Sequence, residues 1–137
     1  MTKYKPGIFT PISRQLWAHE IRVAEILAQA GHYVEFLEER HRIPTADICL
    51  DGIEYEIKSP EAFNPNTIEH TIRNALKQSS NIIIDTSRLK KIRDTQICNF
   101  LTHQSQKYRQ IKRMLVVTKR GKIIEIVGRN KTFRKKS

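Results

Sequence analysis

The stretch ADICLDGIEYEIKSP (residues 46–60) decides how this chain folds. Two short segments with alternating apolar residues flank the pair Asp51-Gly52, and an Asp-Gly pair in this setting is a strong signal for a two-residue turn with positive φ. The sequence therefore predicts a β-hairpin with strands over residues 46–50 and 53–57.

The predicted turn also fixes the register of the hairpin. If two residues form the loop, Asp47 stands directly opposite Glu56, and directly opposed residues share one face of a sheet. Lys58, two residues beyond Glu56, joins them on that face. The alternating apolar residues face the other side: Ile48, Tyr55 and Ile57.

Periodicity and turn signals predict the elements around the hairpin. They give a single α/β domain over residues 1–137, with a core at 14–127, a basic tail at 128–137 and a mixed central sheet flanked by helices. Asn66 to Glu69 resembles a capping box at the start of the second helix. The expected order is α-β-β-β-α-β-α-β-β: helix 14–30, strand 33–37, the hairpin, helix 66–80, strand 81–85, helix 91–108, and a second hairpin of strands 113–118 and 122–127.

The first predicted helix carries one residue that breaks its pattern. It ends at Gly31, which suits a left-handed cap, and most of its apolar residues, Trp17 and Ile21 among them, fall on one broad face. Glu20 lies in the middle of that face. A buried carboxylate needs a partner, so Glu20 is a candidate site residue.

Composition narrows the class of protein. The chain has 137 residues and a net charge of +11. Residues 1–66 hold seven basic and ten acidic residues, a net charge of −3, whereas residues 67–137 hold 18 basic and four acidic residues, a net charge of +14. This asymmetry predicts a polyanionic partner, most simply nucleic acid. No apolar run approaches the ~20 residues of a membrane span, no signal peptide is expected, and Cys49 and Cys98 are expected to be reduced thiols in the core.

The predicted hairpin brings two carboxylates together, which destabilises a sheet unless a cation lies between them. Asp47 and Glu56 therefore predict a site for Mg²⁺ or Mn²⁺, and Zn²⁺ stays open. Glu20 is the expected third acid, acting through water. Lys58 would orient or deprotonate a water that attacks phosphorus. The alternative is that Asp47 and Glu56 are solvated surface residues with Lys58 as a salt-bridge partner, and that Glu20 pairs with a buried Arg or His.

These residues also resemble a known family. Glu20, Asp47 and Glu56-Ile57-Lys58 at the end of a hairpin resemble the PD-(D/E)XK phosphodiesterase superfamily, which has the restriction-endonuclease fold, over roughly residues 17–89. Pro44 lies three residues before Asp47, so the literal Pro-Asp pair is absent. Several segments are similar to the C-terminal nuclease domains of contact-dependent growth inhibition toxins: His19-Glu20, Val34 to Leu37, Tyr55 to Pro60, Thr67 to Glu69, and Arg73 to Gln78 before Ile82 to Asp85.

The resemblance implies a metal-dependent endonuclease that cleaves RNA, typically tRNA, in the cytoplasm of a recipient cell. It implies delivery as part of a larger exported toxin and an acidic immunity protein as partner. By the resemblance, Glu20, Asp47 and Glu56 are metal-binding acids and Lys58 is the catalytic lysine. Two alternatives are a DNA endonuclease of the same fold, acting in repair, in a phage or in a mobile element, and a basic nucleic-acid-binding module without catalysis.

Further residues are expected to support the site or bind the nucleic-acid backbone. Thr71 and Gln78 share one flank of the second helix, and Gln78 could support Lys58 or a phosphate. Exposed basic residues are expected to contact phosphates: Arg73, Lys77, Lys90, Lys91, Arg113, Arg129, Lys131, Arg134, Lys135 and Lys136.

Overall fold

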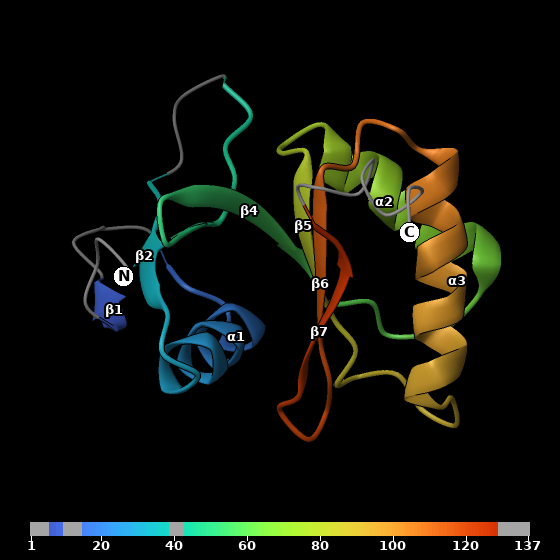
Figure 1. Cartoon of the computed structure of the whole chain (residues 1–137), viewed down its shortest axis with the longest axis horizontal. Helices are drawn as coiled ribbons and strands as arrows, with labels where there is room; N and C mark the ends of the chain where they lie inside the picture. Colours follow the sequence, from blue (N-terminus) through green and yellow to red (C-terminus); the bar gives the residue numbers. More distant parts are fainter. Residues whose placement is uncertain (1–5, 10–14, 39–42, 129–137) are drawn as a thin grey trace, which may run out of the picture.

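The computed structural model describes residues 6–9, 15–38 and 43–128. This part of the chain forms seven strands and three helices (Figure 1). In chain order they are β1 (Gly7–Phe9), α1 (Ala18–Gln29), β2 (Tyr33–Phe36), β3 (Ile48–Leu50), β4 (Ile53–Lys58), α2 (Pro65–Leu76), β5 (Asn81–Asp85), α3 (Asp94–Lys107), β6 (Arg113–Val117) and β7 (Ile123–Val127).

The strands make one mixed sheet in the order β1-β2-β3-β4-β5-β6-β7. β2, β3 and β4 pair antiparallel, β4, β5 and β6 pair parallel, and β6 and β7 form an antiparallel hairpin. Figure 1 shows that the long strand β4 joins a half with β1, β2 and α1 to a half with β5 to β7, α2 and α3. β4 therefore carries its residues into the middle of the molecule.

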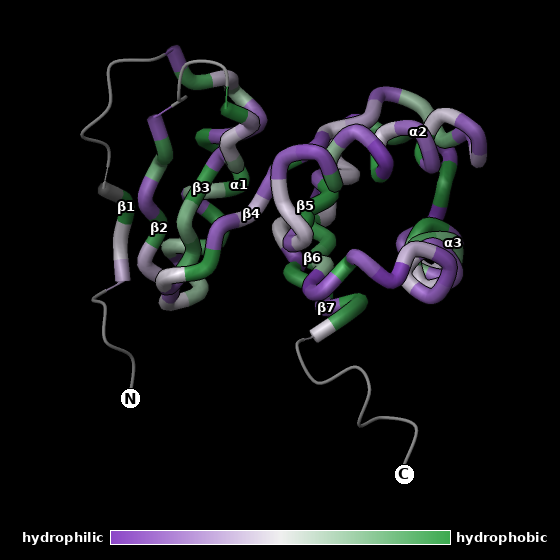
Figure 2. The backbone as a smooth tube through the Cα atoms, turned by 90° about the horizontal axis from the view of Figure 1, so that it is seen from above, coloured by the Kyte–Doolittle hydropathy of each residue, from purple (hydrophilic) through white to green (hydrophobic). Residues whose placement is uncertain are grey.

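Two apolar clusters hold the helices against the sheet, and the view from above in Figure 2 shows the two halves that they fill. Val23, Ala24 and Leu27 of α1 are fully buried in a cluster with Ile48, Tyr55 and Ile57. α2 and α3 pack on a second cluster, which includes Ile68, Ile72, Ile82, Ile84, Leu101 and Met114. The helices thus fix both sides of β4 and β5.

The hairpin register follows the prediction for the three pairs nearest the turn, and β3 begins at Ile48, so Asp47 lies just before the paired strand. Leu50 pairs with Ile53, Cys49 with Glu54, and Ile48 with Tyr55. Asp51 and Gly52 have φ of 49° and 90°, the left-handed values that the turn requires. Asp51 also holds the neighbouring strand, because its Oδ1 accepts a hydrogen bond from the backbone N–H of Tyr33 at 2.8 Å.

Two expectations about helix starts need correction, and one strand was not predicted. β1, which pairs parallel with β2, was not predicted. α1 begins at Ala18, and its N-cap Trp17 has an extended backbone, so the helical wheel does not apply to that residue. The predicted capping box at Asn66 is wrong: Asn64 caps α2 by accepting hydrogen bonds from the N–H groups of Asn66 and Thr67, and Pro65 takes the first helical position.

The other expected helix and strand ends lie within a few residues of those in the structure, where the described residues cover them. Arg14, the expected start of the first helix, and most of the basic tail lie outside the described residues. None of the described helices has the length and apolar character needed to cross a membrane.

Replacing Gly52 by Ala should destabilise the fold, because the left-handed φ of 90° disfavours a residue with a Cβ atom. We expect Gly52→Ala to lower the free energy of unfolding by about 1–2 kcal/mol in urea denaturation. Glu54→Ala, on the exposed side of the next strand, is the control and should change it by less than about 0.5 kcal/mol. Equal stabilities for the two variants would contradict the turn geometry.

Candidate active site

The structure brings Glu20, Asp47, Glu56 and Lys58 to one open cleft of about 510 Å³. They come from three places in the chain: Glu20 from the first turn of α1, Asp47 from the residue before β3, and Glu56 and Lys58 from the second half of β4. The cleft is also lined by Trp17, His19, Leu37, Ile43, Pro44, Thr45, Ala46, Ile57, Ser59 and Gln78.

The backbone around Asp47 holds its side chain in place. Its N–H donates to the carbonyl of Tyr55 at 3.0 Å, and its carbonyl accepts from Leu37 N–H at 3.0 Å. The Asp47 Oδ2 atom accepts a hydrogen bond from the backbone N–H of Ile57 at 2.8 Å. A carboxylate thus serves as the acceptor for a strand N–H, which fixes Asp47 beside Glu56.

Glu56 is buried, with 6% of its surface exposed. Its Oε2 lies 3.3 Å from the Nζ of Lys58. Its Oε1 is buried and has no hydrogen-bond partner among the described residues. An unsatisfied buried carboxylate oxygen is costly, so this atom marks a place where a ligand would relieve the cost.

Glu20 adds a third carboxylate. It is 2% exposed, and its Oε1 accepts a hydrogen bond from the backbone N–H of Trp17 at 2.9 Å, closing the first turn of α1. Its side chain also lies within hydrogen-bond range of Asp47. Within the part of the chain that the structure describes, this buried acid therefore has the N–H of Trp17 and the side chain of Asp47 as partners.

Crowding of these acids changes their protonation. Burial, followed by the negative charge of Glu56, raises the pKa of Asp47 from 3.8 to about 8, with Glu20 adding to the shift and the N–H of Ile57 opposing it. Burial also raises the pKa of Glu56, although the ammonium group of Lys58 opposes this shift. The ionised form of each carboxylate is destabilised unless a further positive charge lies nearby.

The carboxylates of Asp47 and Glu56 are the donors that this cleft would offer to a metal ion. As they stand, the side chains of residues 6–9, 15–38 and 43–128 include no group of three His, Cys, Asp or Glu that could hold one. The pair Asp47 and Glu56 offers carboxylate oxygens, one of them buried without a partner. Mg²⁺ commonly uses one or two carboxylates with waters and substrate phosphate. The residues present therefore fit a hard divalent cation that keeps much of its water.

An ion pair beside the cleft was not foreseen from the sequence. Arg22, which the helical wheel places on the polar side of α1, reaches the fully buried Asp85 at the end of β5, with Nη1 and Oδ1 3.0 Å apart. Asp85 also accepts from Ser59 Oγ at 3.0 Å, and Ser59 lines the cleft. The one signal available was an Asp that ends a buried strand.

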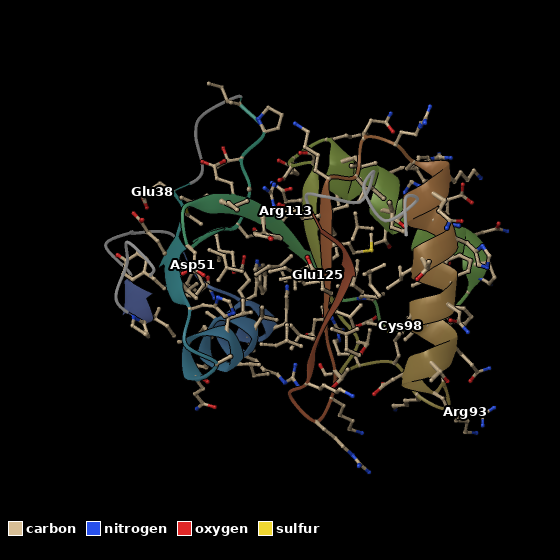
Figure 3. All side chains as sticks on the ribbon, viewed as in Figure 1. Glu38, Asp51, Arg93, Cys98, Arg113 and Glu125 are labelled. Carbon is tan, nitrogen blue, oxygen red and sulfur yellow. The ribbon has the colours of Figure 1, made fainter. Side chains whose placement is uncertain are left out.

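The other candidate residues are distributed more widely. Gln78 lines the cleft, whereas the hydroxyl of Thr71 donates to the carbonyl of Thr67 and does not line it. Arg113, labelled in Figure 3, is half-buried and donates a hydrogen bond to the side chain of Asn81 in β5. Four of the basic residues expected to contact phosphates are exposed, but none of these four lines the cleft: Arg73, Lys77, Lys90 and Lys91. Arg129, Lys131, Arg134, Lys135 and Lys136 lie outside the described residues.

The raised pKa of Asp47 predicts how stability depends on pH without added metal. The folded state holds a proton on Asp47 up to pH about 8, whereas the unfolded chain releases it near 3.8. The folded state therefore binds more protons between these values, and stability should fall as pH rises through the window.

Asp47→Asn keeps a side-chain oxygen for Ile57 N–H but cannot ionise, so it should flatten this dependence. Urea denaturation in EDTA at several pH values between about 4 and 8 measures the effect. The same slope in the wild type and in Asp47→Asn would contradict the assignment.

Comparisons with known proteins place the chain in a family. The family model described as the contact-dependent growth inhibition CdiA C-terminal domain matches residues 44–123. A chain of the CdiA-CT/CdiI toxin and immunity complex from Burkholderia pseudomallei is similar in fold, with a TM-score of 0.61 and 24% identity over 88% of this chain and 94% of that one. No curated protein gives a significant match. The matched residues contain the hairpin, Asp47, Glu56 and Lys58, and the chain belongs to the family of CdiA C-terminal toxin domains.

Proposed function

We propose that this domain is a metal-dependent endonuclease of the PD-(D/E)XK type that hydrolyses phosphodiester bonds. The observation that carries the proposal is the buried Oε1 of Glu56, which has no hydrogen-bond partner in residues 6–9, 15–38 and 43–128, although Glu56 shares the cleft with Asp47 and Lys58. A stable fold rarely keeps such a group without a function. Clusters of acids with perturbed pKa values in a cleft are typical of catalytic sites.

Asp47 and Glu56 would hold Mg²⁺ or Mn²⁺, with Glu20 acting through water; the donor set does not decide against Zn²⁺. A bound divalent cation supplies charge stabilisation at phosphorus. Lys58 lies 3.3 Å from Glu56 and is 30% exposed, so its ammonium group can reach both the acid and a water or phosphate in the cleft. Glu56 thus positions Lys58, and Lys58 orients the attacking water.

RNA is the proposed substrate, with tRNA as its first candidate. This choice rests on the resemblance to growth inhibition toxins and on the family match, and the strongly basic second half of the chain supports a polyanion. We also propose an acidic immunity protein as partner, since a net charge of +11 favours an acidic surface. Delivery within a larger exported protein, with action in the cytoplasm of a recipient cell, agrees with the family.

Cleavage assays test the proposal. Purified protein should cut tRNA when Mg²⁺ or Mn²⁺ is present and should stop when EDTA is added. Glu56→Gln and Lys58→Ala should each lower the cleavage rate by about 100-fold or more. Glu54→Gln is the matched control, because Glu54 lies on the same strand but is exposed and does not line the cleft.

The alternatives give different results in the same assay. Cleavage of DNA with tRNA left intact would favour a DNA endonuclease of this fold. Unchanged behaviour of the Glu56 and Lys58 variants, together with binding of nucleic acid, would favour a module that does not catalyse. Cleavage that persists in EDTA would contradict the metal.

A further inference from the structure

An exposed tryptophan stands at the edge of the candidate site. Trp17 is 62% exposed and Ile43 is 53% exposed. Among the described residues, four large hydrophobic side chains are exposed, and these two both line the cleft that holds Glu56 and Lys58. Exposed aromatic and aliphatic groups beside a polar site commonly mark a binding surface.

The backbone of Trp17 is tied to the carboxylate cluster. Trp17 is the N-cap of α1, and its N–H donates to Glu20 Oε1 at 2.9 Å. Trp17 lies three positions before Glu20, whose side chain is within hydrogen-bond range of Asp47. The backbone of Trp17 is therefore tied to the proposed catalytic centre, and the residue lines the same cleft.

The cleft combines two kinds of surface. One set of its residues is apolar, with the Trp17 ring, Ile43, Leu37 and Pro44, and another set is polar or charged, with Lys58 and Gln78. A nucleotide has the same two parts, a flat base and a phosphate. Stacking of bases on aromatic side chains needs a base that is free of its neighbours, as in single strands and loops.

We propose that Trp17 is a stacking platform for an unpaired base next to the scissile phosphate, with Ile43 as an apolar neighbour. The inference rests on the proposed nuclease function and adds the class of substrate: a single-stranded or looped segment, and not a continuous duplex. Trp17 acts here as a binding and specificity residue. The three acids and Lys58 remain the residues that carry out catalysis.

A protein partner is the other occupant that an exposed tryptophan could fit. The observations favour a base, because the ring shares one cleft with Lys58 and three carboxylates, and a closely packed protein surface would have to cover those charges. Buried unpaired charges are costly at protein interfaces. The experiment separates the two.

Trp17 is the sole tryptophan of the chain, so its fluorescence reports on this position alone. The cleavage-deficient Glu56→Gln variant in EDTA should show saturable quenching when single-stranded poly(A) is added. Inorganic polyphosphate has the charge and lacks bases, so it should bind without quenching. Equal quenching by both polymers, or quenching by neither, would overturn the inference.

Affinity measurements with a labelled single-stranded RNA provide the second readout. In the Glu56→Gln background, Trp17→Ala should weaken binding by roughly 5- to 150-fold, and Trp17→Phe should retain most of the affinity. Ile21→Ala, which removes an exposed side chain of α1 outside the cleft, should bind as its parent does. Urea denaturation checks that each variant folds. Unchanged RNA binding by folded Trp17→Ala would contradict the proposal. A change in Trp17 fluorescence on adding an immunity protein, with no change on adding RNA, would assign Trp17 to a protein interface.

The two proposals can fail separately. If base-dependent quenching occurs but no divalent cation supports cleavage, the proposed nuclease function is contradicted and the stacking site is supported. If cleavage requires Glu56 and Lys58 while Trp17→Ala cleaves single strands and duplexes as the wild type does, the stacking site falls and the nuclease function stands.

Discussion

The rest of the site depends on one constraint, the register of the β3–β4 hairpin. The left-handed turn at Asp51 and Gly52 sets the pairs up to Ile48 and Tyr55, and the next residue on each side brings Asp47 beside Glu56. The N–H of Ile57 then binds Asp47 Oδ2, so the carboxylate cannot turn away from its neighbour without losing a strand hydrogen bond. The fold holds two acids together against their repulsion, which makes the cluster a natural receptor for positive charge.

A second constraint holds the helix that brings the third acid. Arg22 of α1 binds buried Asp85 and also donates to the backbone carbonyls of Thr118 and Lys119, at 2.6 and 2.9 Å. Ser59 donates to the same Asp85. One buried carboxylate therefore links α1, β5, the end of β4 and the β6–β7 turn. Glu20 lies two residues before Arg22, so this network fixes its depth relative to Asp47 and Glu56.

Parts of the fold could be predicted because local chemistry decides them. Asp-Gly requires a tight turn, and strand alternation then assigns Asp47, Glu56 and Lys58 to one face. Asn81 to Asp85 is a short β-branched run and forms the expected strand. The convergence of Glu20 on these residues was an inference from its misplaced charge, and the structure places it there.

Other parts depend on contacts that sequence periodicity does not contain. Trp17 was assigned to the apolar face of a helix, but an N-cap residue has extended dihedral angles and points elsewhere. The pairing of Arg22 with Asp85 joins residues 63 positions apart. β1 is three residues long, and too few residues alternate in it to give a signal. The cap at Asn64 replaced the predicted one because Pro65 favours the first helical position.

The central claim is that the crowded carboxylates of Asp47 and Glu56 hold a divalent cation. Anomalous diffraction from crystals of the wild-type protein grown with Mn²⁺ tests it most directly. The account predicts an anomalous peak within about 2.0–2.6 Å of oxygens of both side chains. A peak elsewhere, or none near this pair while the protein cleaves its substrate with Mn²⁺, would contradict it.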